Sequence, residues 1–90
     1  MPVVHVKYTC QTVVMTGKFD ETIETNEKTI GGLLSELNRN YPGFKDIFIT
    51  PEHGILNLRT MITIKRVGVT PFGVFDPNTE IRNGDKILFW

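Results

Sequence analysis

The stretch of sequence that decides the fold is TIGGLLSELNRNYPG, residues 29–43. Thr29 is a suitable N-cap, because its hydroxyl can accept a hydrogen bond from a backbone amide of the first helical turn. Pro42-Gly43 is typical of the end of a helix. Between these signals the apolar side chains fall at positions i, i+3, i+4, i+7 and i+11, on one stripe of a helix: Ile30, Leu33, Leu34, Leu37 and Tyr41. The spacing predicts a helix over residues 30–40.

Two glycines, Gly31 and Gly32, lie inside this predicted helix, where each costs on the order of 1 kcal/mol relative to alanine. A close approach of the helix to a sheet, or tolerance in the first turn, explains them. A phosphate site would need a longer glycine-rich loop after a strand. We therefore expect a structural role for both.

Two antiparallel strands are expected before the helix. Residues 3–9 alternate between apolar and polar side chains, the period of a strand with one buried face. The alternation resumes over residues 18–24, where Phe19, Glu21 and Ile23 share one side and Glu21 interrupts its apolar character. The uncharged residues 9–17 between them form either a strand extension or a long hairpin loop that ends at a glycine.

The second half of the chain contains further strand signals. Residues 44–49 form an apolar return path, and residues 51–54 an exposed turn. One or two strands are expected between residues 55 and 67, followed by an uncharged loop at 68–75. Asn83-Gly84 is a turn signal directly before a final short strand. This order predicts an α+β sheet crossed by one helix, with the final strand beside the first.

The composition limits the classes of function. Ninety residues suit a single domain, 1–90, and 10 basic residues balance 10 acidic ones without a basic cluster. No nucleic-acid partner is therefore expected, and no apolar run is long enough to cross a membrane. The first residues lack the pattern of a secretion signal, so we expect a cytoplasmic protein. The single cysteine, Cys10, cannot form an internal disulfide.

The helix phrase from Thr29 to Gly43 and the late phrase Ile81-Arg82-Asn83-Gly84-Asp85-Lys86-Ile87 together resemble the MoaD/ThiS family of ubiquitin-like β-grasp proteins. In that family a capped helix ends near Tyr-Pro, and an Asp-Gly-Asp turn precedes an apolar strand. Asn83-Gly84-Asp85 takes the place of that turn here. The resemblance spans nearly the whole chain. It implies a ubiquitin-like β-grasp fold: a mixed four- to five-stranded sheet with one main helix crossing one face.

The resemblance also implies sulfur-carrier chemistry, which the family performs on a terminal Gly-Gly. Its carboxylate is adenylated by an activating enzyme and converted to a thiocarboxylate. Glycines suit a tail that threads a narrow enzyme channel, because they leave the backbone bare. The sequence stops at Trp90 without a diglycine. For the chain as given we therefore expect the carrier mechanism to be blocked.

Other chemistry has weak support in the sequence. Cys10 and His5 could act as nucleophile and base, but they are five residues apart and no third residue orients the imidazole. His5, His53 and Cys10 lie singly rather than in the close pairs typical of zinc sites. Asp20, Glu21 and Glu24 are expected to form the solvated face of the second strand. We expect no enzyme activity, catalytic residue, metal site or cofactor.

The final strand carries too many large apolar side chains for one buried face. Ile87 and Phe89 alternate with Leu88 and Trp90, and the family suggests that the first pair faces the helix. A partner-binding patch is therefore predicted from the second pair and the neighbouring loop, at Phe72, Phe75, Leu88 and Trp90. A small second core under the 68–75 loop is the alternative.

These observations lead to three hypotheses for the function. The first is a docking module or non-catalytic subunit, with an activating enzyme, a larger synthase or oxidoreductase subunit, or a second copy paired through the last strand as its partner. The second is a sulfur carrier in molybdopterin or thiamin-type biosynthesis, if the natural tail is longer or activated atypically. The third is a small enzyme that uses Cys10.

Overall fold

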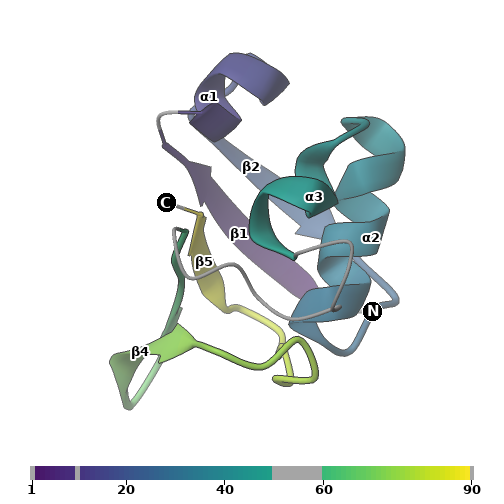
Figure 1. Ribbon diagram of the computed structural model, residues 1–90. Helices are drawn as coiled ribbons and strands as arrows, with labels where there is room; N and C mark the ends of the chain where they lie inside the picture. The colour runs from purple at the N-terminus through teal and green to yellow at the C-terminus, as the bar shows by residue number, and fades with distance from the viewer. Residues whose placement is uncertain (1, 10, 50–59, 90) are drawn as a thin grey trace.

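The computed structural model describes residues 2–9, 11–49 and 60–89. Within these residues the chain forms five strands and three helices, shown in Figure 1. In chain order they are β1 (Val3–Tyr8), α1 (Gln11–Thr16), β2 (Asp20–Glu24), α2 (Ile30–Asn40), α3 (Phe44–Phe48), β3 (Ile62–Arg66), β4 (Val69–Val74) and β5 (Lys86–Phe89). The longest of these helices, α2, has 11 residues, and none of them is long and apolar enough to span a membrane.

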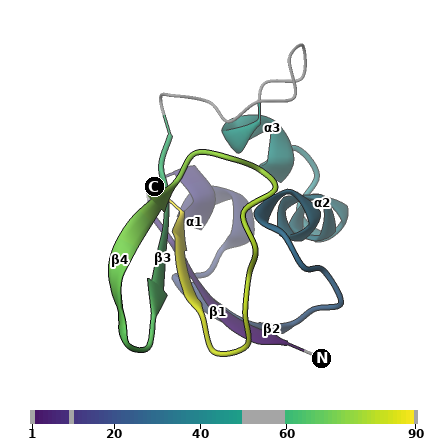
Figure 2. The same ribbon diagram turned by 90° about the horizontal axis from the view of Figure 1, so that it is seen from below.

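The strands form one mixed sheet in the order β2-β1-β5-β3-β4. β1 and β5 are parallel, and every other neighbouring pair is antiparallel. Helices α2 and α3 lie on the same side of the sheet (Figure 2). The predicted mixed sheet, with the last strand beside the first and one main helix over one face, is confirmed. Because β5 has a strand on each side, it offers no edge for strand pairing with a second copy. Self-association through the side chains of the last strand stays a prediction.

Strand alternation determines which side chains enter the core. Val6, Ile87 and Ile64 lie opposite one another across β1, β5 and β3, and all three are fully buried under α2 and α3. Phe89, on the same side of β5, packs with Phe44 and Phe48, with ring centroids 5.3 and 5.1 Å away. Ile87 and Phe89 therefore face the helices as predicted. The side chains between these positions point to the other side of the sheet, which we call the open face.

Helix α2 begins and ends where the sequence predicts. The Thr29 hydroxyl accepts a hydrogen bond from the backbone amide of Gly32 at 3.1 Å, and the Tyr41 amide donates to the Leu37 carbonyl at 2.7 Å. The apolar stripe is buried at Ile30, Leu33, Leu34 and Leu37.

The two glycines of α2 do mark a close approach, but to a loop rather than to the sheet. A Cβ atom on Gly31 would lie 3.1 Å from the carbonyl oxygen of Pro77, in the β4–β5 connection. A Cβ atom on Gly32 would collide with a carboxylate oxygen of Glu27. The Gly31 amide donates to the Pro77 carbonyl at 2.7 Å, and that of Ile30 to Thr79 at 2.9 Å. Carbonyl groups of the β4–β5 connection therefore already accept hydrogen bonds from the first-turn amides that a phosphate would need.

The segment after β1 is neither a strand extension nor a hairpin loop, because residues 11–16 form helix α1. Threonine hydroxyls satisfy its backbone ends. The Thr12 hydroxyl accepts from the Thr9 amide at 2.9 Å and donates to the Thr9 carbonyl at 2.8 Å. At the other end Thr16 donates to the Thr12 carbonyl, and Gly17, with φ of 72°, ends the helix.

Two more segments differ from the prediction. The apolar return path contains a five-residue helix, α3, which buries Phe44 and Phe48. The segment predicted as a loop at 68–75 contains the edge strand β4, which pairs with β3 from Ile62↔Val74 to Arg66↔Val69. Strand β3 lies inside the region expected to hold one or two strands. Residues 51–54 and 55–59 lie outside the described residues, and the turn and strand expected there stay predictions.

The Asn-Gly-Asp turn holds the start of β5 against β1. The Asn83 side chain accepts from the Val3 amide at 2.8 Å, and the Gly84 amide donates to the Val3 carbonyl at 2.7 Å. Asp85 is 1% exposed, and its carboxylate accepts two hydrogen bonds from Arg66, at 2.9 and 2.8 Å, and one from the Arg82 amide at 2.8 Å. Burial raises the pKa of Asp85, but these donors outweigh it and leave the pKa below its ordinary value.

Replacing Asp85 by alanine should lower the free energy of unfolding by about 2–4 kcal/mol, because Arg66 and the Arg82 amide lose their buried acceptor. Urea denaturation followed by circular dichroism measures the change. Glu80→Ala is the matched control, since it removes an exposed ion pair with Arg82 and should cost below about 0.5 kcal/mol. Equal losses in the two variants would contradict this role for Asp85.

Candidate functional site

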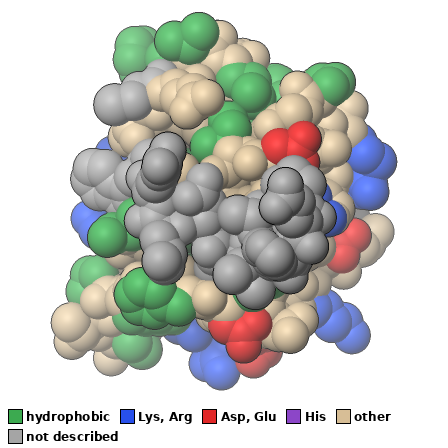
Figure 3. Space-filling model, in the orientation of Figure 1, with side chains coloured by type: hydrophobic (Ala, Val, Ile, Leu, Met, Phe, Trp, Pro, Cys, Tyr) green, Lys and Arg blue, Asp and Glu red, His purple; other side chains and the backbone are tan. Residues whose placement is uncertain are grey.

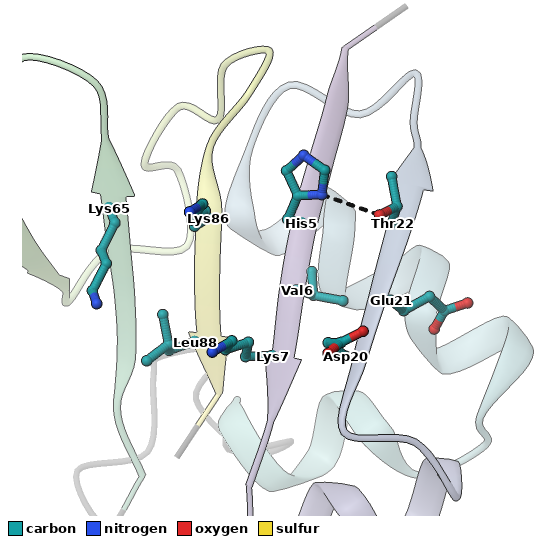
Figure 4. A pocket seen from close by; sticks show the side chains of 9 residues that line it. All are labelled: His5, Val6, Lys7, Asp20, Glu21, Thr22, Lys65, Lys86 and Leu88. Atoms are coloured by element: carbon teal, nitrogen blue, oxygen red, sulfur yellow. Dashed lines mark hydrogen bonds between the residues drawn. The ribbon is translucent and has the colours of Figure 1, made fainter.

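The open face contains a shallow hollow of about 310 Å³ over β2, β1, β5 and β3 (Figure 4). Leu88 on β5 is its apolar side chain on this face, and it is half-buried. Basic side chains from three strands surround it, and the residues lining the hollow are His5, Val6, Lys7, Asp20, Glu21, Thr22, Lys65, Lys86 and Leu88.

Strand register places the basic side chains in two adjacent rows. His5, Lys86 and Lys65 lie directly opposite one another across β1, β5 and β3. In the next row Lys7 lies opposite Leu88. Side chains opposite one another in neighbouring strands have Cβ atoms about 4.5–5.5 Å apart. Leu88 is therefore bordered by lysines, and the face combines an apolar centre with positive charge.

These lysines differ from the chain's paired cations. Lys18, Arg66 and Arg82 each form an ion pair, with Glu21, Asp85 and Glu80 respectively. In the part of the chain that the structure describes, Lys7, Lys65 and Lys86 have no ion-pair partner within 4.0 Å. Their positive charge is thus available to a molecule that approaches the open face.

The structure divides the predicted partner-binding residues between two faces. Phe72 lies opposite Ile64 on the helix side of the sheet, packs against the core and has the Arg66 guanidinium 5.4 Å from its ring centroid. Phe75 is 79% exposed, and its ring lies 3.4 Å from where a Cβ atom on Gly73 would be. Gly73 alternates with Phe72 along β4, so this ring lies on the side of Leu88. Trp90 lies outside the described residues.

Several other exposed apolar side chains are not among the residues that line the hollow. Val14 on α1, Phe19 just before β2, and Val67 in the β3–β4 turn are largely exposed. Phe19 therefore does not share the buried side of β2 as the alternation suggested. Figure 3 views the molecule in the orientation of Figure 1 and shows hydrophobic groups at the end occupied by α1 and at the corner occupied by β4.

A second polar cluster joins β1, β2 and the end of α2 around one carboxylate. Glu21 accepts hydrogen bonds from the hydroxyls of Tyr8 and Tyr41 at 2.9 and 3.0 Å, and from Lys18 Nζ at 3.1 Å. Burial raises the pKa of Glu21, but these three donors leave it below its ordinary value. Burial and the bond to Glu21 raise the pKa of the Tyr8 hydroxyl. Asp20 and Glu24 are exposed as predicted, whereas Glu21 is not on the solvated face of β2.

Of the residues considered for nucleophilic or metal chemistry, His5 is the one that the structure describes. His5 Nδ1 is hydrogen-bonded to Thr22 Oγ1 at 3.0 Å. Cys10 and His53, the other residues considered for nucleophilic or metal chemistry, lie outside the described residues. Residues 2–9, 11–49 and 60–89 contain no group of three or more His, Cys, Asp or Glu side chains that could hold a metal ion.

Solved structures with the same arrangement of strands and helices exist. Small archaeal modifier protein 1 from Haloferax volcanii has a TM-score of 0.70 and 16% identity, over 98% of this chain and 92% of that one. A putative molybdopterin converting factor, subunit 1, from Pyrococcus furiosus has a TM-score of 0.69 and 19% identity, over 99% and 95%. CysO from Mycobacterium tuberculosis, described as an antigen, has a TM-score of 0.67 and 21% identity, over 97% and 96%.

The chain has the β-grasp fold. Its structural neighbours are MoaD/ThiS-like β-grasp proteins, so the resemblance in the helix phrase and the Asn-Gly-Asp turn is confirmed at the level of the fold. No protein-family model matches the sequence, and no curated protein matches it.

Replacing Glu21 by glutamine should lower the free energy of unfolding at pH 7 by about 1–2 kcal/mol, because the tyrosines and Lys18 lose a charged acceptor. The pKa of Glu21 is lowered by folding, so its contribution is complete above the unfolded-state pKa of about 4.3. It is lost as the pH falls through the lower folded-state pKa. The wild-type and variant stabilities should therefore converge in acid.

Denaturant unfolding between pH 2 and 7 tests this convergence. Glu24→Gln is the control, because Glu24 is exposed on the same strand and should change stability by less than about 0.5 kcal/mol throughout. A stability gap between the wild type and the Glu21→Gln variant that is independent of pH would contradict the role of the charge.

Proposed function

We propose that this β-grasp protein is a docking module that binds another protein through its open face. The central strand β5 presents Leu88 in a hollow of about 310 Å³ that the described helices leave uncovered, and this observation supports the proposal most directly. An apolar side chain inside a polar border is the usual composition of a protein interface. Leu88 supplies the apolar contact, and the surrounding polar groups orient the partner.

Phe75 extends this proposed contact surface, since its exposed ring lies beside Gly73 on the same side of the sheet as Leu88. Phe72 packs against the core on the other side, so it contributes by supporting β4 rather than by direct contact with the same partner. The partner-binding role of Trp90 stays a prediction.

The comparisons support a role in association with another protein. The Pyrococcus furiosus neighbour is described as a subunit of a converting factor, and the Haloferax volcanii neighbour as a modifier protein. Both descriptions are of proteins that act with others rather than of self-sufficient enzymes. The partner we propose is an activating enzyme or a larger synthase or oxidoreductase subunit, and the β-grasp protein itself has no catalytic role.

Leu88→Ser should weaken binding to the partner by at least about 10-fold, because it removes the apolar centre of the interface. The partner is isolated with the tagged full chain from its native cells, purified, and titrated by calorimetry with each variant. Val67→Ser is the matched control, since Val67 is 96% exposed in the β3–β4 turn and is not a lining residue of the hollow. Equal affinities of the Leu88 variant and the wild type would refute docking at this face.

A sulfur carrier is the second candidate, and the neighbour described as a molybdopterin converting factor subunit favours it. In that reaction the terminal carboxylate of the chain would attack ATP, releasing pyrophosphate, and a sulfur donor would displace AMP from the acyl adenylate. One carboxylate oxygen leaves with AMP, and one sulfur replaces it.

Intact-mass spectrometry tests the carrier function on the chain with its natural C-terminus. The chain is incubated with an activating enzyme, ATP and a sulfur donor. A mass increase equal to one oxygen-to-sulfur exchange, localised to the C-terminal fragment, is the result expected of a carrier. An unchanged mass, alongside complete conversion of a known carrier in the same reaction, rejects it.

A further inference from the structure

The open face concentrates like charges in a way that the overall composition does not require. The chain as a whole has 10 basic and 10 acidic residues. Lys65 and Lys86 nevertheless lie directly opposite each other on β3 and β5. Lys7 adds a further positive charge in the next row (Figure 4). Like charges at directly opposite positions destabilise a sheet.

The acidic residues near this face are displaced to one edge. Asp20 lies opposite Lys7, and Glu24 opposite Val3, so both belong to the edge strand β2. Across β1, β5 and β3, the charged side chains lining the hollow are basic. The field of the face is therefore asymmetric, negative at the β2 edge and positive over β5 and β3.

We propose that the open face binds an acidic protein surface whose carboxylates surround one apolar side chain. The carboxylates pair with Lys7, Lys65 and Lys86, and the apolar side chain enters the hollow against Leu88. This inference rests on the proposed docking function and adds the chemistry of the partner. Charge complementarity of this kind selects partners and accelerates their association.

The same geometry favours a protein over a polyanion. A nucleic acid or an anionic membrane binds most tightly to a broad cluster of cations. This face has three lysines with an apolar residue between them. Asp20 would repel phosphates along the β2 side of the hollow. A folded acidic surface can place its carboxylates over β1, β5 and β3, leave the β2 edge free, and offer an apolar group to Leu88.

The proposal predicts opposite effects of one substitution on stability and on binding. Lys65→Gln and Lys86→Gln each remove a repulsion, so the thermal midpoint at low salt should rise by about 1–4 °C. The same substitutions should weaken binding of an acidic partner. A lysine kept for a structural reason would lower both quantities when it is replaced.

Binding is measured with a defined probe, a synthetic peptide in which glutamates and aspartates flank a Leu-Phe pair. Amide chemical shifts of the labelled protein should change at His5, Lys7, Lys65, Lys86 and Leu88. Each glutamine variant should bind about 3- to 10-fold more weakly, and affinity should fall as salt increases. Lys28→Gln is the matched control, because Lys28 is exposed in the β2–α2 connection and should leave the affinity unchanged.

Several results would overturn the inference. They are the absence of shifts on the open face, equal binding of a peptide with glutamine and asparagine in place of its acids, and a lower thermal midpoint of both lysine variants. Tighter binding of inorganic phosphate, single-stranded DNA or phosphatidylserine vesicles to the same residues would also do so. If the isolated partner of the docking experiment depends on Leu88 but not on salt or lysine, docking stands and the acidic partner is rejected.

Discussion

The parallel pairing of β1 with β5 at the centre of the sheet determines the arrangement of everything else. Parallel neighbours cannot be joined by a tight turn, so the chain must leave the sheet and return to it. That connection carries α2 and α3 over one side only (Figure 2). These helices cover the buried row of Val6, Ile87 and Ile64. None of the described helices covers the open face on the other side of the sheet. The open face is thus a direct result of the central pairing.

The parts of the fold that the sequence predicts well are those with local causes. Helix α2 has its N-cap at Thr29 and its apolar stripe within 11 residues, and the turn before β5 depends on Asn83 and Gly84. The sequence does not predict helix α1, because threonine hydroxyls satisfy its ends and the β-branched residues of the segment favour a strand. The sequence does not predict strand β4 either, because this strand depends on pairing with β3, which no local pattern reveals.

The candidate site depends on register, and for that reason the sequence predicted only part of it. The position of Leu88 on the side of the sheet away from the helices is predicted by alternation along a single strand. Lys7, Lys65 and Lys86 are far apart in the chain, and only the pairing of β1, β5 and β3 brings them together. A loop at residues 68–75 implies no alternation of side chains. In strand β4, however, Phe72 faces the core and Gly73 faces the other side of the sheet. Glu21 interrupts the apolar pattern of β2. Its carboxylate is tolerated there because two tyrosine hydroxyls and a lysine donate hydrogen bonds to it.

The central position of β5 also has a consequence during synthesis. On the ribosome, β1 and β2 can pair as soon as they emerge, and β3 and β4 can do the same later. Neither unit can join the other until residues 86–89 have left the exit tunnel, because β5 is the strand between them. Closure of the five-stranded sheet therefore depends on β5, the last of the described strands in chain order.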